Sequence, residues 1–132
     1  MTGGPHPYAP RLGALIEDGG VRFRVWAPDA SRVAVRIEDG GSATDVPMQP
    51  EEAGYFTTHV PGIHAGARYR YVLDGAAAYP DPASRFQPHG VHGASAVVDP
   101  SMFAWHDEAW RGVDRDRVTR MELHVGTFTP EG

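Results

Sequence analysis

The 132-residue sequence predicts an all-β fold, an antiparallel sandwich of immunoglobulin-like type. Several short segments alternate apolar and polar residues with a period of two, which is typical of strands that bury one face. The 16 glycines and 12 prolines are spread between these segments, as turn residues are. Roughly seven short strands separated by turn signals are typical of a two-sheet sandwich.

Three segments show the clearest alternation: Gly20–Trp26, residues 32–37 and Arg68–Leu73. In the first, Val21 and Phe23 share a face with Val25, whereas arginines occupy the other face. The turn after it, residues 27–31, contains a proline and an aspartate, both of which favour turns. Weaker strand candidates lie at residues 12–16, 45–48, 55–60 and 95–98.

The pattern changes after residue 78. Residues 79–93 contain three prolines and two glycines, which exclude a regular helix or a central strand and predict an ordered loop pinned by aromatic side chains. A short helix is predicted within residues 102–110, and a strand at residues 118–126. The apolar face of that strand consists of Met121, Leu123 and Val125. Such a strand needs neighbours and a cover, so we expect the sequence to have been cut from something larger.

Composition restricts the partners and the location. The chain has 12 Lys+Arg, all of them arginine, and 17 Asp+Glu, giving a net charge of −5. This acidic balance argues against nucleic acid or an anionic membrane surface as a partner. Without cysteine there is no disulfide and no thiolate metal site. No apolar run approaches 18 residues and no secretory signal is visible, so we expect no membrane span and a cytoplasmic location.

Four motifs carry a resemblance to a known family. They are GVRFRVWAPDAS at residues 20–31, YPDPASRFQPHGVHGASAVVDP at 79–100, FAWHDEAWRG at 103–112 and MELHVGTFTPEG at 121–132. Together they resemble the malto-oligosyltrehalose trehalohydrolases of the α-amylase superfamily (glycoside hydrolase family 13), over all but the first ten residues. The VRFRVWAP segment is shared by many enzymes of that superfamily, whereas the last motif and PDPASRFQPHGVHG are much more specific.

The resemblance implies a domain order. It implies a flexible N-terminus (1–10) and an early-set sandwich related to family 48 carbohydrate-binding modules (11–98). A linker with a short helix (99–117) and the first strand of a truncated (β/α)8 barrel (118–132) follow. The implied parent enzyme hydrolyses the α-1,4-glucosidic bond that releases trehalose from malto-oligosyltrehalose. Its own barrel, absent from this sequence, is the implied partner, and α-glucan or malto-oligosyltrehalose a further one.

Two alternatives to the accessory-domain hypothesis stay open. The chain could be a stand-alone module that binds α-glucan, such as maltodextrin or glycogen. It could also be an immunoglobulin-like interaction domain without a sugar role, which the specific motifs disfavour. An aromatic platform exposed on the isolated sandwich would favour the glucan-binding module over the accessory domain.

No catalytic residue, cofactor or metal is predicted in these residues. Retaining glycosidases need two carboxylates roughly 5 Å apart, and in the family these lie on middle barrel strands, beyond residue 132. Asp114 and Asp116, or Glu51 and Glu52, are neighbours in sequence only and are expected to be solvated. The parent is therefore an enzyme, but the fragment itself is expected to be non-catalytic.

Two polar clusters admit a second interpretation. His89 and His92 could form a metal site with Asp81, but a Gly-bounded loop without a further fixed ligand favours hydrogen bonds that pin the loop. Glu122 and His124 share one face of the predicted last strand. A buried polar network is the favoured role for that pair.

Aromatic side chains are the candidates for sugar contact, because the C–H faces of sugars stack on aromatic rings. The substrate-binding candidates are Trp26, Tyr55, Trp105 and Trp110. Trp26 directly follows Val25, so it is expected on the face opposite the apolar one. For all three tryptophans, packing in the core or against a neighbouring domain is the favoured interpretation.

Overall fold

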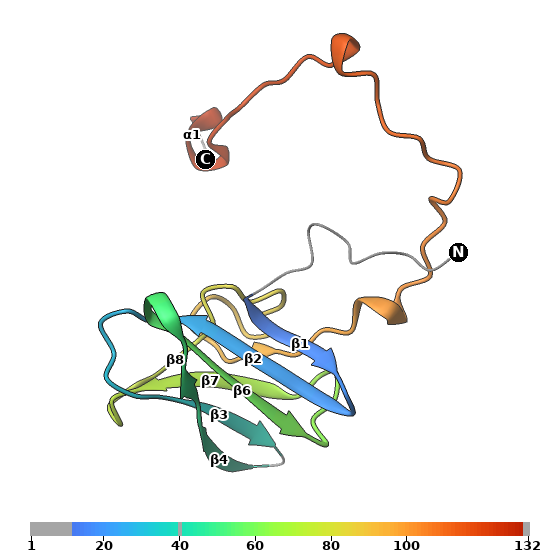
Figure 1. The fold of residues 1–132 in the computed structure, drawn as a ribbon. Coiled ribbons are helices and arrows are strands. Elements are labelled where there is room, and N and C mark those ends of the chain that lie inside the picture. The colour runs from blue at the N-terminus through green and yellow to red at the C-terminus, as the bar shows by residue number, and fades with distance from the viewer. Residues whose placement is uncertain (1–11, 40, 131–132) are drawn as a thin grey trace.

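Strands form where the sequence alternates. A computed structural model describes residues 12–39 and 41–130 and places β2 at Gly20–Trp26, β3 at Val33–Asp39 and β7 at Arg68–Leu73 (Figure 1). The predicted flexible N-terminus, residues 1–10, lies outside the described residues. The prediction of an all-β sandwich is confirmed.

The strands form two antiparallel sheets. The first has the order β1-β2-β6-β5, with β1 at Gly13–Glu17, β5 at Gln49–Pro50 and β6 at Tyr55–Pro61. The second has the order β4-β3-β7-β8, and β9 also pairs with β7. Its remaining strands are β4 at Ser42–Pro47, β8 at Ala78–Tyr79 and β9 at Ser95–Ala96.

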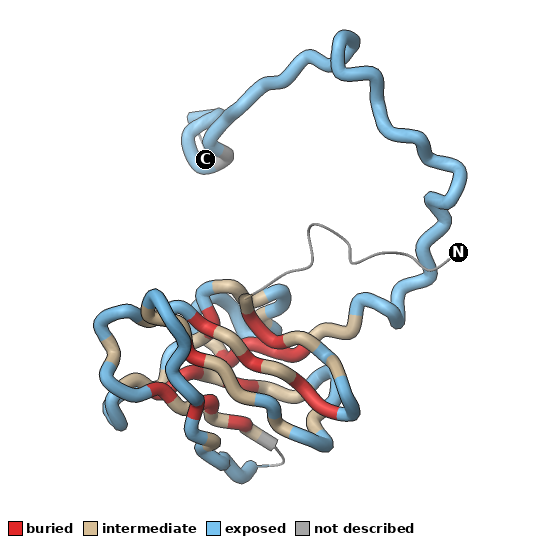
Figure 2. Tube along the Cα trace, in the orientation of Figure 1, coloured by how far each residue is buried: buried red, intermediate tan, exposed pale blue. Residues whose placement is uncertain are grey.

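The core lies between the two sheets (Figure 2). Val21, Phe23 and Val25 of β2 face it from the first sheet, as the alternation predicts. The second sheet contributes Tyr69 and Tyr71. The Phe23 and Tyr69 rings meet edge to face with centroids 4.9 Å apart, a favoured aromatic geometry. Burying a large apolar side chain contributes about 1.5–3 kcal/mol, so this layer is the main source of stability.

The bounds of two strands differ from the predictions. The segment predicted at residues 45–48 is β4, which begins at Ser42 and ends at Pro47. After Met48 the chain changes sheets, and Gln49 and Pro50 pair with β6 as β5. The predicted strand at 95–98 is shorter, since only Ser95 and Ala96 pair with β7.

The C-terminal segment differs most from the sequence-based expectation. The predicted helix within residues 102–110 is absent from the described structure; only a 3-10 turn, Pro100–Met102, forms at its start. A second 3-10 turn spans Arg115–Arg117. The strand predicted at 118–126 is not confirmed: residues 118–124 belong to no strand, and Val125–Phe128 forms the single turn α1. A strand is held by ladder hydrogen bonds to a neighbour, and the described residues offer this segment none.

The C-terminal segment leads away from the sandwich (Figure 1). Between residues 100 and 130, every residue whose burial is described is exposed (Figure 2). The described helices are each one turn long, and none has the length and hydrophobicity needed to cross a membrane.

Candidate functional site

The candidate site lies where β2 and β6 meet on the outer face of the first sheet. The register of the two strands places Trp26 directly opposite Tyr55. Trp26 is 56% exposed, whereas its neighbour Val25 is buried, so its side chain lies on the outer face as the alternation predicts. The structure therefore brings together two of the four aromatic candidates.

A strained turn fixes the Trp26 indole. The Trp26 Nε1–H donates to the Ala53 carbonyl oxygen at 3.0 Å. Ala53 has φ +58° and the following Gly54 has φ +80°, so two consecutive residues adopt left-handed backbone. A Cβ on Gly54 would lie 2.6 Å from the Pro28 Cα, which leaves room for glycine only. Because this turn is held in place, the indole has one preferred orientation.

Arg24 makes the two aromatic rings differ in how accessible they are. Its Nε donates to the Glu51 Oε2 at 2.7 Å, which neutralises the charge. Its guanidinium carbon lies 4.1 Å from the centroid of the Tyr55 ring, a cation–π contact. One face of Tyr55 is thus covered by Arg24, and Trp26 is the more accessible aromatic of the pair.

A cavity of about 200 Å³ lies beside Trp26. The end of β2 and the first residues of the 79–93 loop form its opposite walls. Its lining consists of Leu12, Arg24, Val25, Trp26, Asp81, Pro82 and Ala83. The loop after β8 therefore completes the site.

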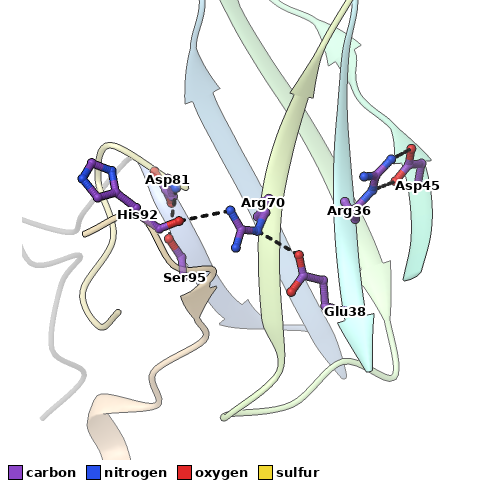
Figure 3. A network of polar contacts seen from close by, with 7 residues as sticks. All are labelled: Arg36, Glu38, Asp45, Arg70, Asp81, His92 and Ser95. Carbon is purple, nitrogen blue, oxygen red and sulfur yellow. Dashed lines mark hydrogen bonds and ion pairs between the residues drawn. The ribbon is translucent and has the colours of Figure 1, made fainter. Parts of the chain in front are cut away.

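Asp81 anchors this loop in the protein interior. It is 3% exposed, and its Oδ2 accepts a hydrogen bond of 2.6 Å from the Tyr69 hydroxyl. Its Oδ1 accepts from the Ala83 N–H at 2.7 Å, and its own N–H donates to the Ser95 Oγ at 3.0 Å (Figure 3). Burial raises the pKa of Asp81, while the bond from Tyr69 counteracts the rise. Burial, and then the Asp81 charge, likewise raise the pKa of Tyr69.

Two arginines hold the rest of the loop. Arg85 donates through Nη1 to the Ala14 carbonyl oxygen at 2.8 Å, which joins the loop to β1. Arg70 donates through Nη1 to the His92 carbonyl oxygen at 3.3 Å (Figure 3). The sequence predicts an ordered loop pinned by aromatic side chains; Tyr69 supplies such a contact, and arginine contacts add to it.

The polar face of the second sheet is an ion-pair ladder across β4, β3 and β7 (Figure 3). Arg36 pairs with Asp45 at 2.6 Å, and Arg70 pairs with Glu38 at 2.9 Å. The hydrogen bond from Arg36 holds the pKa of Asp45 below its usual range. Both carboxylates are thus paired with arginine and form no acid/base pair.

The metal hypothesis gains no support from the geometry. Both Asp81 carboxylate oxygens already accept hydrogen bonds, and the His92 ring points away from Asp81 (Figure 3). Among residues 12–39 and 41–130, no three His, Asp or Glu side chains gather as a metal site would require.

The remaining aromatic candidates lie elsewhere. Trp105 and Trp110 belong to the exposed C-terminal segment and are 61% and 69% exposed. Trp105 packs edge to face on Phe103, with centroids 4.7 Å apart. The structure does not bring these two tryptophans to the Trp26 cavity.

The carboxylates considered for catalysis have local roles. Asp114 accepts a hydrogen bond from the Asp116 N–H at 3.1 Å and caps a 3-10 turn. Glu51 is paired with Arg24. Glu122 and His124 are both exposed, so the buried polar network expected for them is not formed.

Sequence reasoning missed two parts of the site. The turn at Ala53 and Gly54 gives no local signal that it meets Trp26, which lies 27 residues earlier. The wall formed by Pro82 and Ala83 was hidden in a loop that long-range contacts, such as those of Asp81 with Tyr69 and of Arg85 with Ala14, hold in place. The PDP motif at residues 80–82 indicates a rigid bend, but not what the bend faces.

Comparisons with known proteins agree with this architecture. Residues 11–100 match the family model of carbohydrate-binding module 48, the isoamylase N-terminal domain. A malto-oligosyltrehalose trehalohydrolase from Saccharolobus solfataricus is 42% identical over 121 residues, 92% of this chain and 21% of the relative. One from Deinococcus radiodurans is 43% identical over 129 residues, 96% of this chain and 20% of the relative.

Solved structures show the same likeness. A crystal structure described as an α-amylase from Salmonella typhimurium aligns with a TM-score of 0.73 and 38% identity, over 93% of this chain and 20% of that chain. The chain spans about a fifth of the length of the curated relatives it matches. Since the family model covers well over half of the residues, the chain belongs to the carbohydrate-binding module 48 (isoamylase N-terminal domain) family.

Proposed function

We propose that the chain is the N-terminal accessory domain of a malto-oligosyltrehalose trehalohydrolase. The enzyme hydrolyses the α-1,4-glucosidic bond that releases trehalose from malto-oligosyltrehalose. One observation carries the proposal: the match to the Saccharolobus relative covers 92% of 132 residues, so it extends beyond the family model, which ends at residue 100. The likeness therefore includes a segment that a sandwich alone does not need. The proposal assigns the enzyme to trehalose biosynthesis in the cytoplasm.

The exposed C-terminal segment supports a role in a larger enzyme. It carries apolar side chains in contact with solvent: Met102, Phe103, Trp105, Trp110, Val113, Met121 and Phe128. Large apolar side chains exposed in number along one segment are typical of a segment that another part of a protein covers. We propose that residues 11–98 form an early-set sandwich and 99–117 a linker. Residues 118–132 would then become the first strand of a (β/α)8 barrel once neighbouring strands cover them.

The first test is catalytic. The purified chain should release no trehalose from malto-oligosyltrehalose, because the two carboxylates that such an enzyme needs are expected on middle barrel strands, which these residues do not include. A chimera tests the accessory role directly. In it, this chain replaces the matching fifth of the Deinococcus relative, and the same relative without that fifth is the control.

The chimera should recover trehalose release that the shortened enzyme loses. A folded chimera as inactive as the shortened enzyme would contradict the accessory role. Trehalose release by the isolated chain that scales with its concentration would contradict the non-catalytic assignment.

A second candidate function is binding of α-glucan by the sandwich itself. The exposed, oriented indole of Trp26 beside a cavity favours it. Titration with maltoheptaose tests it: a saturable isotherm that is lost in Trp26→Ala, with the fold retained by circular dichroism, supports binding. A chain that only docks to a barrel should show no saturation below millimolar sugar.

A further inference from the structure

The core face of the first sheet is incompletely covered at one end of β1. The register of β1 with β2 places Ile16 directly opposite Val21, and directly paired residues of an antiparallel sheet point to the same face. Val21 is fully buried in the core, so Ile16 lies on the core face as well. Ile16 is nevertheless 40% exposed. An apolar side chain that belongs to the core layer is therefore left in contact with solvent.

A cavity of about 370 Å³ lies at this end of β1. It is lined by Ala14, Leu15, Ile16, Arg85, Val98, Asp99, Pro100 and Ser101. Part of the lining thus comes from β1, and another part comes from residues 98–101, which directly precede the exposed C-terminal segment. A cavity of about 150 Å³ lined by apolar side chains holds one benzene ring, so this cavity has room for about two aromatic rings.

The lining suits aromatic rings in its chemistry as well. Arg85 donates through Nη1 to the Ala14 carbonyl oxygen at 2.8 Å, which fixes its guanidinium at the border of the cavity. A guanidinium within about 6 Å of the centroid of an aromatic ring attracts the face of that ring. Ile16 and Val98 add apolar surface to the lining. The cavity therefore favours an aromatic occupant over a polar one.

An aromatic pair follows the lining residues in the chain. Phe103 and Trp105 begin two residues after Ser101, and their rings already pack edge to face with centroids 4.7 Å apart. Phe103 is 62% exposed and Trp105 is exposed to the same degree. Two rings that lack cover thus lie next in sequence to a cavity with room for two rings.

The chain is long enough to bring this pair back. Two residues beyond Ser101 span at most about 7 Å and four residues at most about 14 Å. Asp99 Oδ1 accepts hydrogen bonds from the Ser101 N–H at 2.9 Å and from the Ser101 hydroxyl at 2.7 Å, which hold the chain as far as this residue. The next hydrogen bond, from the Phe103 N–H to the Pro100 carbonyl oxygen, is long at 3.4 Å. Rotation of the backbone just after Ser101 is therefore enough to turn Phe103 and Trp105 toward the cavity.

We propose that the Phe103–Trp105 pair folds back into this cavity and completes the core at the end of β1. The occupant is a segment of this same chain, so the folded unit extends to Trp105, past residue 100 where the family match ends. The conformation with both rings exposed is then the undocked one. The inference depends neither on the accessory role nor on glucan binding. In a larger enzyme, the docked pair would fix where the linker leaves the sandwich.

Phe103→Ala and Phe128→Ala in the full chain form a matched pair, because both rings are 62% exposed in the undocked conformation. If that conformation were the whole answer, the two substitutions would have equal and small effects. Docking predicts that Phe103→Ala raises the equilibrium constant of unfolding at least about tenfold in urea titration, since a buried ring is lost. Phe128→Ala should change it by no more than about twofold.

A double-mutant cycle with Ile16→Ala tests whether Phe103 acts at this cavity. Residues in contact have non-additive effects on stability, whereas distant residues do not. In the Ile16→Ala background, Phe103→Ala should raise the unfolding constant by less than about threefold, because the cavity no longer holds the ring as closely. Phe128→Ala should have the same effect in both backgrounds.

Nuclear magnetic resonance of the full chain observes the contact directly. A ring seated in the cavity should shift the Ile16 methyl signals to high field and give nuclear Overhauser effects from the Phe103 and Trp105 rings to those methyls. Phe103→Ala should return the signals toward their ordinary positions, and Phe128→Ala should leave them unchanged. The shifts should also persist on dilution, because the rings and the cavity belong to one molecule.

Three results would overturn the inference. Equal effects of Phe103→Ala and Phe128→Ala, with unshifted Ile16 methyls, would show that the pair stays undocked. Destabilisation by Phe103→Ala without coupling to Ile16 would place the ring elsewhere on the sandwich. Methyl shifts that disappear on dilution would assign the cavity to the segment of a second copy of the chain.

Discussion

The hydrogen bond from Tyr69 to Asp81 joins the core to the loop that completes the candidate site, and Tyr69→Phe removes it. The donor is 1% exposed and the acceptor 3%, and the two oxygens are 2.6 Å apart. The substitution deletes one oxygen and leaves the ring, so it creates almost no cavity. The effect on the free energy of unfolding therefore reports the hydrogen bond.

The size of the effect follows from the charge of the acceptor. A hydrogen bond to an ionised group contributes about 1.5–3 kcal/mol, and one between neutral groups about 0.5–1.5 kcal/mol. Tyr69→Phe also leaves the buried Asp81 Oδ2 without this donor. We expect a loss of about 2 kcal/mol above the folded-state pKa of Asp81, where the acceptor is charged, and of about 1 kcal/mol below it, where the acceptor is neutral.

The pH dependence has a defined sign. Burial raises the folded-state pKa of Asp81 above the ordinary 3.8, so the folded protein holds this proton more tightly than the unfolded chain. The stability that Asp81 contributes is fully present below the unfolded pKa and is lost as the pH rises through the folded pKa. The Tyr69 bond lowers the folded pKa, so Tyr69→Phe should move this loss to higher pH and enlarge it.

Urea unfolding of both proteins between pH 3 and pH 7 measures these quantities. Tyr79→Phe is the matched control, because the Tyr79 side chain is 51% exposed. Loss of this exposed hydroxyl should change the free energy of unfolding by no more than about 0.5 kcal/mol. Equal losses in both variants, or a Tyr69→Phe loss that does not vary with pH, would refute the reasoning.

Three other predictions concern the fold. Phe23→Ala should lower the free energy of unfolding by about 3–5 kcal/mol in urea titration, since the ring is fully buried; a loss below about 1 kcal/mol would contradict the assigned core. Gly54→Ala should lower the free energy of unfolding by about 1–3 kcal/mol more than Gly19→Ala in the same titration. Both glycines have positive φ, but only a Cβ at Gly54 would meet Pro28. Equal losses would show that the turn can shift to make room for a Cβ. In hydrogen exchange, amides of residues 118–124 should exchange far faster than those of β2, and equal protection in a dilute monomer would contradict their exposed state.

The sequence predicts the central strands well because their environment is asymmetric. In β2, one face meets the core and the other meets solvent, and the residues alternate accordingly. The two-residue strands β5 and β8 are too short to carry a period, so no pattern indicates them. Residues 118–124 show the opposite case: their alternation is clear, but a strand also requires a hydrogen-bonded neighbour.

Only part of the candidate site could be predicted from the sequence. Trp26 could be placed on the outer face, because it continues the alternation of its own strand. Its fixed orientation depends on Ala53, and its cavity depends on Pro82, both distant in sequence. Contacts of this kind are set by how distant strands pair and how loops pack on them, which local pattern does not encode.

The bond from Arg85 to the Ala14 carbonyl oxygen also bears on the order in which the protein can assemble. The two residues are 71 positions apart, so β1 leaves the ribosome long before the arginine that secures it exists. At about 5–20 residues per second, that delay is about 4–14 s. During this interval the early strands have apolar faces but no second sheet, and closing such a long loop is slow. The nascent chain is therefore most prone to aggregation between the synthesis of β2 and that of β9. During that period, a chaperone that shields Val21 and Phe23 would raise the yield of folded protein.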